Sequence, residues 1–325
     1  MNAFDPAALE CLAALADGGS FERAAQQLAI TQSAVSQRLR ALETGLGRLL
    51  VVRARPLRLT EPGKVLLRYA RQMQAMRADI ARELGAGQAQ DERLPIAVNA
   101  DSLATWVLPA LDPVVRAGQR DGYGIELVVD DQDFTHQVLR EGVVLGCVST
   151  VAEALRGCSV QPLGCMRYVA VASAGLLAQA LPQGLHRGNL ASVPWLVFNR
   201  KDDMPATWLE RAFALRGPRL IERHVPSSEA HVQAALMGWG IGVMPEQLAA
   251  PGLASGVLQP VHASVCVDVL LHWHQWRLLP SEAPATVASA NPAAGSTRPP
   301  LRAGALDRIG QALADGARAA LRPPQ

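Results

Sequence analysis

The sequence predicts an α/β protein with a small helical module at its N-terminus. Three observations lead to this prediction: helical apolar spacings in the first 60 residues, a heptad-like helix after them, and short apolar strands that alternate with helices from Leu94 onward. The chain has 325 residues, of which 49% are hydrophobic and 18% charged. Such a composition can build more than one core, and it excludes a chain that is disordered as a whole.

Three short helices are predicted within the first 46 residues. Asp5 and Pro6 suit the start of the first helix, and the pair Gly18–Gly19 ends it. Ser20 is a suitable N-cap for the second helix, and Thr31 is one for the third. The third helix, over 32–46, carries an apolar stripe at helical spacing, formed by Val35, Leu39, Leu42 and Leu46.

The opposite face of the third helix is polar and cationic. A helix, a tight break and a second helix with such an outward face are typical of a helix-turn-helix that enters the major groove of double-stranded DNA. An ordinary three-helix bundle is the alternative. The residues we expect to contact base edges or the nearby backbone are Gln32, Ser33, Ser36, Gln37 and Arg40.

The segment over 49–60 predicts a two-stranded wing after the third helix. Its arginines are candidates for contacts to phosphates or the minor groove, and they are Arg53, Arg55 and Arg58. Residues 20–60 contain seven arginines against only Glu22 and Glu43, whereas the net charge of the whole chain is +2. A polyanion is therefore expected to bind at this end only.

A linker helix is predicted after Thr60, with a narrow apolar seam close to heptad spacing. The seam residues are Leu66, Tyr69, Met73, Met76, Ile80 and Leu84. Such a seam needs a second copy of itself, so the sequence predicts a homodimer, which also suits DNA with two half-sites. We therefore assign residues 1–60 to a winged helix-turn-helix, 61–92 to a dimerisation helix with a hinge, and 93–325 to a third domain.

The third domain reads as strands separated by helices, which predicts a mainly parallel sheet in two subdomains with a cleft between them. The predicted strands lie over 94–98, 124–130, 143–149, 166–173, 195–198, 220–225, 240–245 and 265–274. Residues 281–300 are rich in Pro, Ala, Ser and Thr and are predicted to form a disordered insert. Helical periodicity resumes over 301–321.

The stretch SFERAAQQLAITQSAVSQRLRALETGLGRLLVVRARPLRLTEPG resembles the winged helix-turn-helix of LysR-type transcriptional regulators. The same order of elements extends this resemblance over residues 4–280. Within the family, RLPIAVNADSLATWVLPAL, KDDMP and VPSSEAHVQ resemble the arginine- and lysine-responsive branch of activators. The resemblance implies a periplasmic-binding-protein-like effector domain, a dimer or homotetramer, and control of amino-acid export or metabolism genes, with RNA polymerase as a further partner.

If the effector is L-lysine or L-arginine, the cleft must hold a carboxylate and a cation. Helix starts suit the carboxylate, because their N–H groups are free, and acidic side chains suit the cation. Candidates near strand ends and helix starts are Asn99, Ser102, Trp106, Ser149, Thr150, Ser227 and Ser228. Acidic candidates are Asp130, Asp131, Asp202, Asp203 and Glu229.

Enzyme and metal sites are not indicated. His272 and His274 alternate on one predicted strand without a third ligand at regular spacing, and Cys266 has no orienting partner, so a structural role is predicted. No cofactor is expected. The five cysteines form no CxxC pair, and neither a leader nor a membrane span is apparent, so we expect a cytoplasmic protein with no membrane partner.

Three rival functions stay open from the sequence. The first is an architectural DNA-binding protein of weak specificity with a degenerate effector cleft. The second is a LysR-type regulator of a different small metabolite. The third is an α/β ligand-binding protein or enzyme that does not bind DNA.

Overall fold

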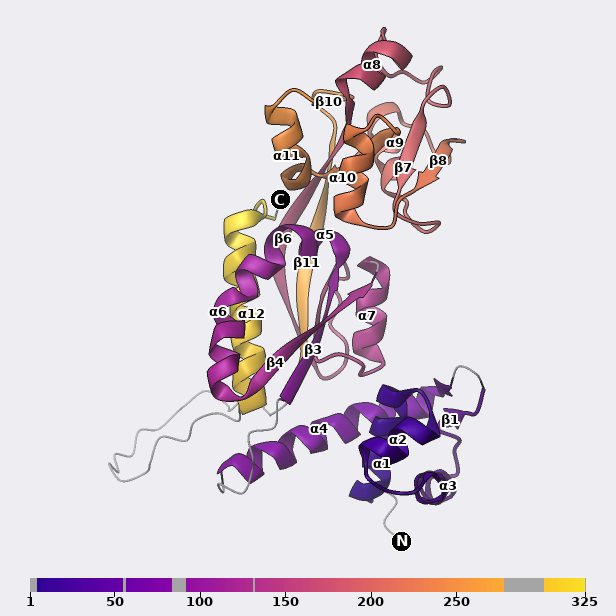
Figure 1. The fold of residues 1–325 in the computed structure, drawn as a ribbon, viewed down its shortest axis with the longest axis vertical. Helices are drawn as coiled ribbons and strands as arrows, with labels where there is room; N and C mark the ends of the chain where they lie inside the picture. Colours follow the sequence, from indigo (N-terminus) through magenta and orange to yellow (C-terminus); the bar gives the residue numbers. More distant parts are fainter. Residues whose placement is uncertain (1–4, 55–56, 84–91, 131, 278–300, 325) are drawn as a thin grey trace, which may run out of the picture.

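The computed structural model describes residues 5–54, 57–83, 92–130, 132–277 and 301–324. An N-terminal module of three helices and a small hairpin comes first, and a long helix, α4, follows it (Figure 1). An elongated body of two lobes, which share a single sheet, makes up the rest. The predicted insert over 281–300 lies outside the described residues.

The N-terminal module consists of α1 (Pro6–Gly18), α2 (Phe21–Gln27), α3 (Gln32–Leu46) and the antiparallel strands β1 (Val51–Val52) and β2 (Arg58–Leu59). Ser20 Oγ accepts a hydrogen bond from Arg23 N at 3.2 Å, and Thr31 Oγ1 accepts one from Ala34 N at the same distance. Both caps were expected from the sequence. The apolar stripe of α3 is buried against α1, so the polar face of α3 is turned outward.

The linker helix α4 (Glu61–Glu83) differs from its predicted role in one respect. Leu66 is buried in the core of the N-terminal module, and Met73 packs against that core. These two positions therefore serve this chain's own module, because α4 lies directly against α1. Tyr69 is exposed and available to a second copy, whereas nothing is described of the side chains at 76 and 80.

The body contains one sheet with the strand order β4-β3-β5-β11-β6-β9-β7-β8, and β10 pairs with β6. The strands are β3 (Glu92–Asn99), β4 (Tyr123–Asp130), β5 (Gly146–Ser149), β6 (Cys158–Ser173), β7 (Pro194–Val197), β8 (Ile221–His224), β9 (Ile241–Pro245), β10 (Leu258–Pro260) and β11 (Cys266–Trp276). The sheet is mixed rather than mainly parallel, because β6 and β11 run antiparallel to their neighbours. These two strands cross from one lobe to the other.

The proximal lobe is built on β3, β4 and β5, and the distal lobe on β7, β8, β9 and β10. Helices of the proximal lobe are α5 (Ala100–Ser102), the π-turn η1 (Leu103–Val107), α6 (Leu108–Asp121), α7 (Gln132–Arg140) and α12 (Leu301–Ala320). Helices of the distal lobe are α8 (Ala174–Ala180), α9 (Met204–Phe213), α10 (Ser228–Leu236) and α11 (Glu246–Ala254). Figure 1 shows the two lobes joined by the crossing strands.

The terminal helix α12 packs on α6, β6 and β11, as its apolar periodicity predicts. Gly316 permits the close approach, since a Cβ at this position would lie 2.3 Å from the Cβ of Ala110. After the helix, Arg322 pairs with Cys165 of β6 through reciprocal backbone hydrogen bonds of 2.8 and 3.0 Å. The end of the chain is therefore part of the sheet.

Candidate functional site

The polar face of α3 is the first candidate site. Gln32, Ser33, Gln37 and Arg40 are exposed, and Ser36 is half-buried. Gln32 Nε2 donates to Glu22 Oε1 at 3.2 Å, and the hydroxyls of Thr31 and Ser33 lie 2.9 Å apart. The structure therefore presents all five predicted residues on one exposed helix, with short side chains at its start and an arginine further along.

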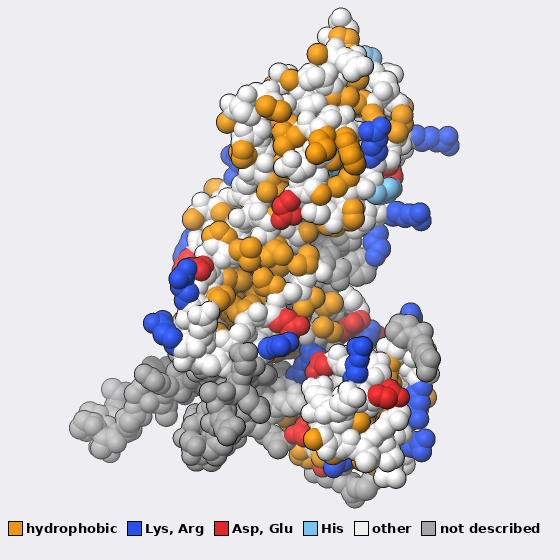
Figure 2. Space-filling view, viewed as in Figure 1, with side chains coloured by type: hydrophobic (Ala, Val, Ile, Leu, Met, Phe, Trp, Pro, Cys, Tyr) orange, Lys and Arg blue, Asp and Glu red, His pale blue; other side chains and the backbone are white. Residues whose placement is uncertain are grey.

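The hairpin contributes cations beside α3. Arg58 lies exposed on β2, and the guanidinium of Arg53 lies 5.3 Å from the centroid of the Phe21 ring. Arg55 lies outside the described residues. Figure 2 shows several Lys and Arg side chains along one margin of the N-terminal module. A cationic margin beside an exposed polar helix suits contact with a nucleic-acid backbone.

The second candidate site is a cavity of about 320 Å³ between the two lobes. Its volume lies near the lower end of the ~300–1,000 Å³ range of ligand sites, which fits a molecule of amino-acid size. The proximal lobe, the crossing strands and the distal lobe all contribute to its wall. The polar residues that line it are Asn99, Asp101, Thr150, Tyr168, Asn199, Lys201, Asp202, Asp203, Thr207, Ser228 and His231.

Asp101 joins three parts of the body at this cavity. Its Oδ2 accepts a hydrogen bond from Tyr168 Oη at 2.7 Å, and its Oδ1 accepts one from Ser228 Oγ at 2.6 Å. Asp101 belongs to the proximal lobe, Tyr168 to crossing strand β6, and Ser228 to the first turn of α10 in the distal lobe. One carboxylate therefore connects both lobes at the site where a ligand would lie.

Two further cavity residues have polar atoms that are buried without a partner. Both side-chain atoms of Asn99, Oδ1 and Nδ2, are unpaired, and so is Nε2 of His231. Asn99 is 2% exposed and His231 is 6% exposed. Burial lowers the pKa of His231, so its imidazole is neutral near pH 7. These groups have hydrogen-bonding capacity left for a polar molecule that enters the cavity.

Asp202 and Asp203 differ in their availability to a ligand. The carboxylate of Asp202 accepts hydrogen bonds from Phe198 N at 2.7 Å and Met204 N at 3.0 Å, and burial raises its pKa. Asp202 therefore stabilises the loop before α9. Asp203 is exposed at the rim of the cavity and makes no side-chain cap bond to α9.

Of the predicted effector residues, the structure brings five to the cavity: Asn99, Thr150, Asp202, Asp203 and Ser228. Ser102, Ser149, Ser227 and Glu229 do not line it. Ser149 Oγ accepts from Val151 N and Ser227 Oγ accepts from Ala230 N, while Ser102 is buried and Glu229 is exposed. These groups serve local turns or caps, or lie away from the cavity.

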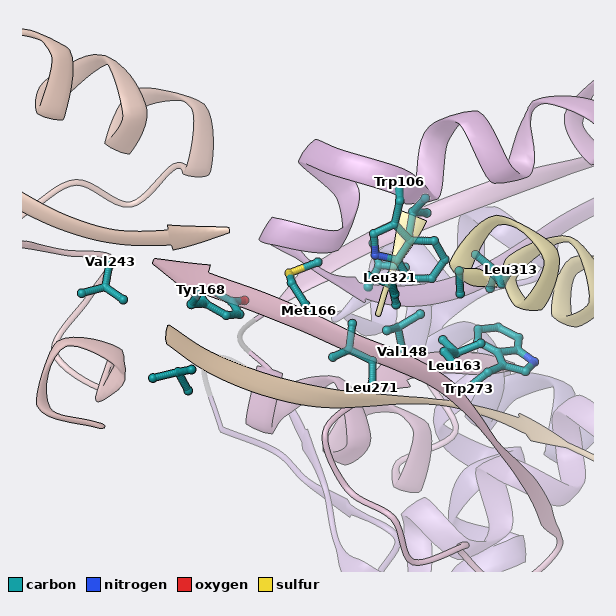
Figure 3. Packing of buried hydrophobic residues seen from close by; sticks show 14 of the residues in the cluster. Trp106, Val148, Leu163, Met166, Tyr168, Val243, Leu271, Trp273, Leu313 and Leu321 are labelled. Atoms are coloured by element: carbon teal, nitrogen blue, oxygen red, sulfur yellow. The ribbon is translucent and has the colours of Figure 1, made fainter. Parts of the chain in front are cut away.

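Trp106 is also outside the cavity. It is 3% exposed and points into the proximal core that also holds Leu313 and Leu321 (Figure 3). The sequence placed it beside the ligand because the helix start is close by, but η1 turns the side chain toward α12. Asp130 ends β4 opposite Asn99, and nothing is described of its side chain. Asp131 lies outside the described residues.

Sequence reasoning missed the other polar residues that line the cavity, which are Asp101, Tyr168, Asn199, Lys201, Thr207 and His231. Asp101 had a usable signal, because an acidic residue two positions after the end of a strand lies near the carboxyl edge of a parallel sheet. His231 follows Ser228 by three residues on the same helix, so it shared the signal that pointed to Ser228. Tyr168 had none, since its cavity neighbours Asp101 and Ser228 are distant in sequence. Only the crossing of the lobes brings them together.

The imidazoles proposed for a structural role lie in the interior. His272 and His274 are buried, and the ring centroids of His136 and His274 are 5.2 Å apart. Within the described ranges, no three His, Cys, Asp or Glu side chains are placed to hold a metal ion. Among the helices described, none is long and apolar enough to span a bilayer.

Family comparisons agree with this division of the chain. Residues 6–64 match the family described as "Bacterial regulatory helix-turn-helix protein, lysR family", and residues 87–292 match the "LysR substrate binding domain". The chain is 39% identical over 279 residues to the HTH-type transcriptional regulator ArgP of Aeromonas salmonicida, which covers 86% of this chain and 92% of that protein.

Two solved structures have the same fold over nearly their whole length. ArgP from Mycobacterium tuberculosis superposes with a TM-score of 0.78 at 35% identity, covering 98% of each chain. Full-length LysG from Corynebacterium glutamicum with bound effector Arg gives a TM-score of 0.72 at 34% identity, covering 98% of this chain and all of that one. The chain therefore belongs to the LysR family of DNA-binding transcriptional regulators, which are not enzymes.

Proposed function

We propose that the regulator is controlled by a basic α-amino acid, L-arginine or L-lysine, which binds in the cavity between the lobes. The observation that supports this most is the set of unpaired groups on Asn99 and His231 beside the carboxylate of Asp101. A relative that is 34% identical was solved with arginine as its effector. The cavity also has the size that such a ligand needs.

The head of an amino acid suits the junction of Asp101 and α10. Ser227 caps this helix, and Ser228, in its first turn, touches Asp101. The free N–H groups of a helix start favour the α-carboxylate, and the neighbouring carboxylate favours the α-ammonium. Because these two ligand groups are attached to one carbon, they need partners that are as close together as Asp101 and the start of α10.

The cationic end of the ligand then extends toward the rim. Asp203 is exposed there, and Lys201 lies on the same loop. We infer that Asp203 favours a ligand with a distant positive charge, while Asn99 and His231 bind the head. Asp202 is a weaker candidate, since its carboxylate already binds two backbone N–H groups.

We further propose that α3 reads base edges through Gln32, Ser33, Ser36, Gln37 and Arg40, while Arg53, Arg55 and Arg58 bind the backbone or the minor groove. The regulator would act as a homodimer or homotetramer on two half-sites. Its ligand state would alter DNA bending or the recruitment of RNA polymerase, at genes of amino-acid export or metabolism.

Calorimetric titration of the full-length chain with arginine, lysine and citrulline tests the effector proposal. Citrulline keeps the length of arginine and its α-amino acid head but carries no side-chain charge. We expect saturation by arginine or lysine and weaker binding of citrulline. Absence of heat with either basic amino acid at millimolar concentration, together with saturation by another metabolite, would assign the cavity to that metabolite.

Sequence-specific regulation also has to be distinguished from architectural DNA binding. A duplex selected from a random library by the full-length chain should compete about 10³-fold or more better than random DNA at fixed salt. An architectural protein of weak specificity would show little preference between the two duplexes. The measurement is fluorescence anisotropy with unlabelled competitors.

A further inference from the structure

A basic stripe on the linker helix contacts the proximal lobe, in addition to the approach of α4 to α12. Lys64, Arg68 and Arg71 are spaced four and three residues apart, so they lie on the same face of α4. Lys64 Nζ lies 2.7 Å from Glu141 Oε1, and Arg71 Nη1 donates to the carbonyl oxygen of Gly142. Both partners belong to the turn between α7 and β5, which is far from α4 in sequence.

Arg68 lies between these two contacts. Its guanidinium carbon is 5.2 Å from the centroid of the Trp276 ring, at the end of β11. Gly142 has φ +72°, and a Cβ there would lie 2.9 Å from Arg68 Cγ. The turn is therefore shaped to let the helix approach closely. We name the turn Glu141–Gly142 together with Trp276 the linker dock.

The other face of α4 belongs to the N-terminal module. Leu66 and Ala70 are buried in that module's core, and Arg71 Nη2 bonds Asp17 of α1. Arg71 therefore binds the N-terminal module and the proximal lobe with a single guanidinium. Any rotation of the module relative to the proximal lobe must break the contacts of Lys64, Arg68 and Arg71.

Two elements extend from the ligand cavity to the linker dock. Strand β11 carries Val267 and Val269 in the cavity wall and Trp276 at its opposite end, roughly 23–30 Å away at about 3.3 Å per residue. Helix α7 follows β4, which ends beside Asn99, and leads to Glu141. Figure 1 shows α7 descending toward the N-terminal module.

We propose that the linker dock binds α4 of the same chain and thereby sets the position of the DNA-binding module according to the state of the ligand cavity. Ligand binding and DNA binding are then coupled through this surface, and removing the surface reduces the coupling in both directions. The docking itself does not depend on which ligand occupies the cavity.

Zero-length carbodiimide cross-linking tests the docking directly, because it joins an amine to a carboxylate only where the two are in contact. The chain contains only two lysines, Lys64 and Lys201, so the products are few. We expect a peptide that links Lys64 to Glu141 in the full-length protein. Lys64 also forms an ion pair of 2.9 Å with Glu61, so a Lys64–Glu61 product serves as an internal control that shows the amine to be reactive.

Three variants and an isotope mixture sharpen this experiment. Glu141→Gln should abolish the product, and Arg68→Ala, which keeps both reactive groups, should lower its yield about fivefold or more if stacking on Trp276 seats the helix. Glu210→Gln, in an ion pair of the distal lobe, is the matched control and should change nothing.

Mixing ¹⁴N and ¹⁵N protein before cross-linking should give no mixed-isotope product, since the contact lies within one chain.

The link to function is measured as the ratio of affinities for a selected duplex with and without saturating arginine. Allosteric coupling typically spans about 5- to 150-fold, and Glu141→Lys should bring this ratio close to one while Glu210→Lys leaves it unchanged. Three results would overturn the proposal. The first is a Lys64–Glu61 product without a Lys64–Glu141 product, and the second is a mixed-isotope Lys64–Glu141 product. The third is an unchanged affinity ratio in Glu141→Lys. If arginine has no effect on the unmodified protein, the effector assignment fails, while the cross-link still decides the docking.

Discussion

Asp101→Asn should weaken every α-amino acid ligand by a similar factor, whatever the charge of its side chain. The carboxylate of Asp101 has about four lone-pair sites. Two of them accept the hydroxyls of Tyr168 and Ser228, which leaves room for a ligand ammonium. The substitution keeps the shape but removes the negative charge beside that ammonium.

Asp101 is half-buried in the structure, and a ligand that fills the cavity would cover the rest of its carboxylate. A desolvated cation left without its carboxylate costs about 2–5 kcal/mol, and the lower figure corresponds to roughly 30-fold in affinity. We therefore expect arginine and citrulline each to bind about 30-fold more weakly or worse. Asp203 is exposed, so its ion pair with a guanidinium contributes only about 1 kcal/mol, or roughly fivefold. Asp203→Asn should thus weaken arginine and leave citrulline unchanged.

Titration calorimetry of both variants with both ligands checks this pair of expectations. Ser228→Ala is a useful comparison, because it removes a hydroxyl donor of Asp101 but keeps the carboxylate. A loss confined to arginine in Asp101→Asn, with no loss for citrulline, would refute the assignment of the α-ammonium to Asp101. It would place the guanidinium there instead.

Three other predictions concern DNA recognition, assembly and pH. Arg40→Ala should reduce the preference for the selected duplex over random DNA by about 1–3 kcal/mol, and equal effects on both duplexes would contradict this. Arg58→Ala should weaken the binding of both duplexes equally and reduce the slope of log affinity against log salt concentration by roughly one unit. Tyr69→Asp should split the dimer in sedimentation without unfolding the N-terminal module, whereas Met73→Asp should destabilise that module by about 1–3 kcal/mol, because Met73 packs against its core. Acidification should lower the free energy of unfolding. Burial lowers the pKa of four imidazoles, those of His136, His231, His272 and His274. Below about pH 6.5 the unfolded chain therefore binds protons that the folded chain does not. Each imidazole that stays neutral contributes about 1.4 kcal/mol per pH unit, and urea unfolding at pH 7.5 and 5.5 would show no difference if this reasoning is wrong.

The sequence predicted local structure well where the cause was local. Ser20 and Thr31 cap their helices, and the stripe of α3 is buried, because caps and helical spacing depend on neighbours within a few residues. The seam of α4 was only partly understood, since periodicity shows that Leu66 and Met73 are buried but does not show by what. Either a second helix or the chain's own α1 satisfies the same spacing.

The cavity was harder to predict because its residues meet only through long-range topology. Ser228 was found from its place at a helix start and Asp203 from its charge, but Tyr168, which lies within the predicted strand over 166–173, meets Asp101 only because β6 passes between the two lobes. The sequence predicted a strand over 166–173, whereas β6 begins at Cys158 and crosses both lobes. A crossing strand that is mistaken for a short one does not show which distant elements its residues meet.

The pairing of Arg322 with Cys165 has a consequence for synthesis on the ribosome. The proximal lobe begins at β3 but needs β11, α12 and the last residues to complete its sheet and core, while the distal lobe lies between them in sequence. Domains generally fold in the order in which they emerge, so the N-terminal module forms first and the proximal lobe last. A chain released before α12 would carry a finished DNA-reading unit on an unfinished sensor. Such a product would carry the exposed face of α3 intact, while Asn99 and Asp101 would belong to a lobe whose sheet and core are incomplete.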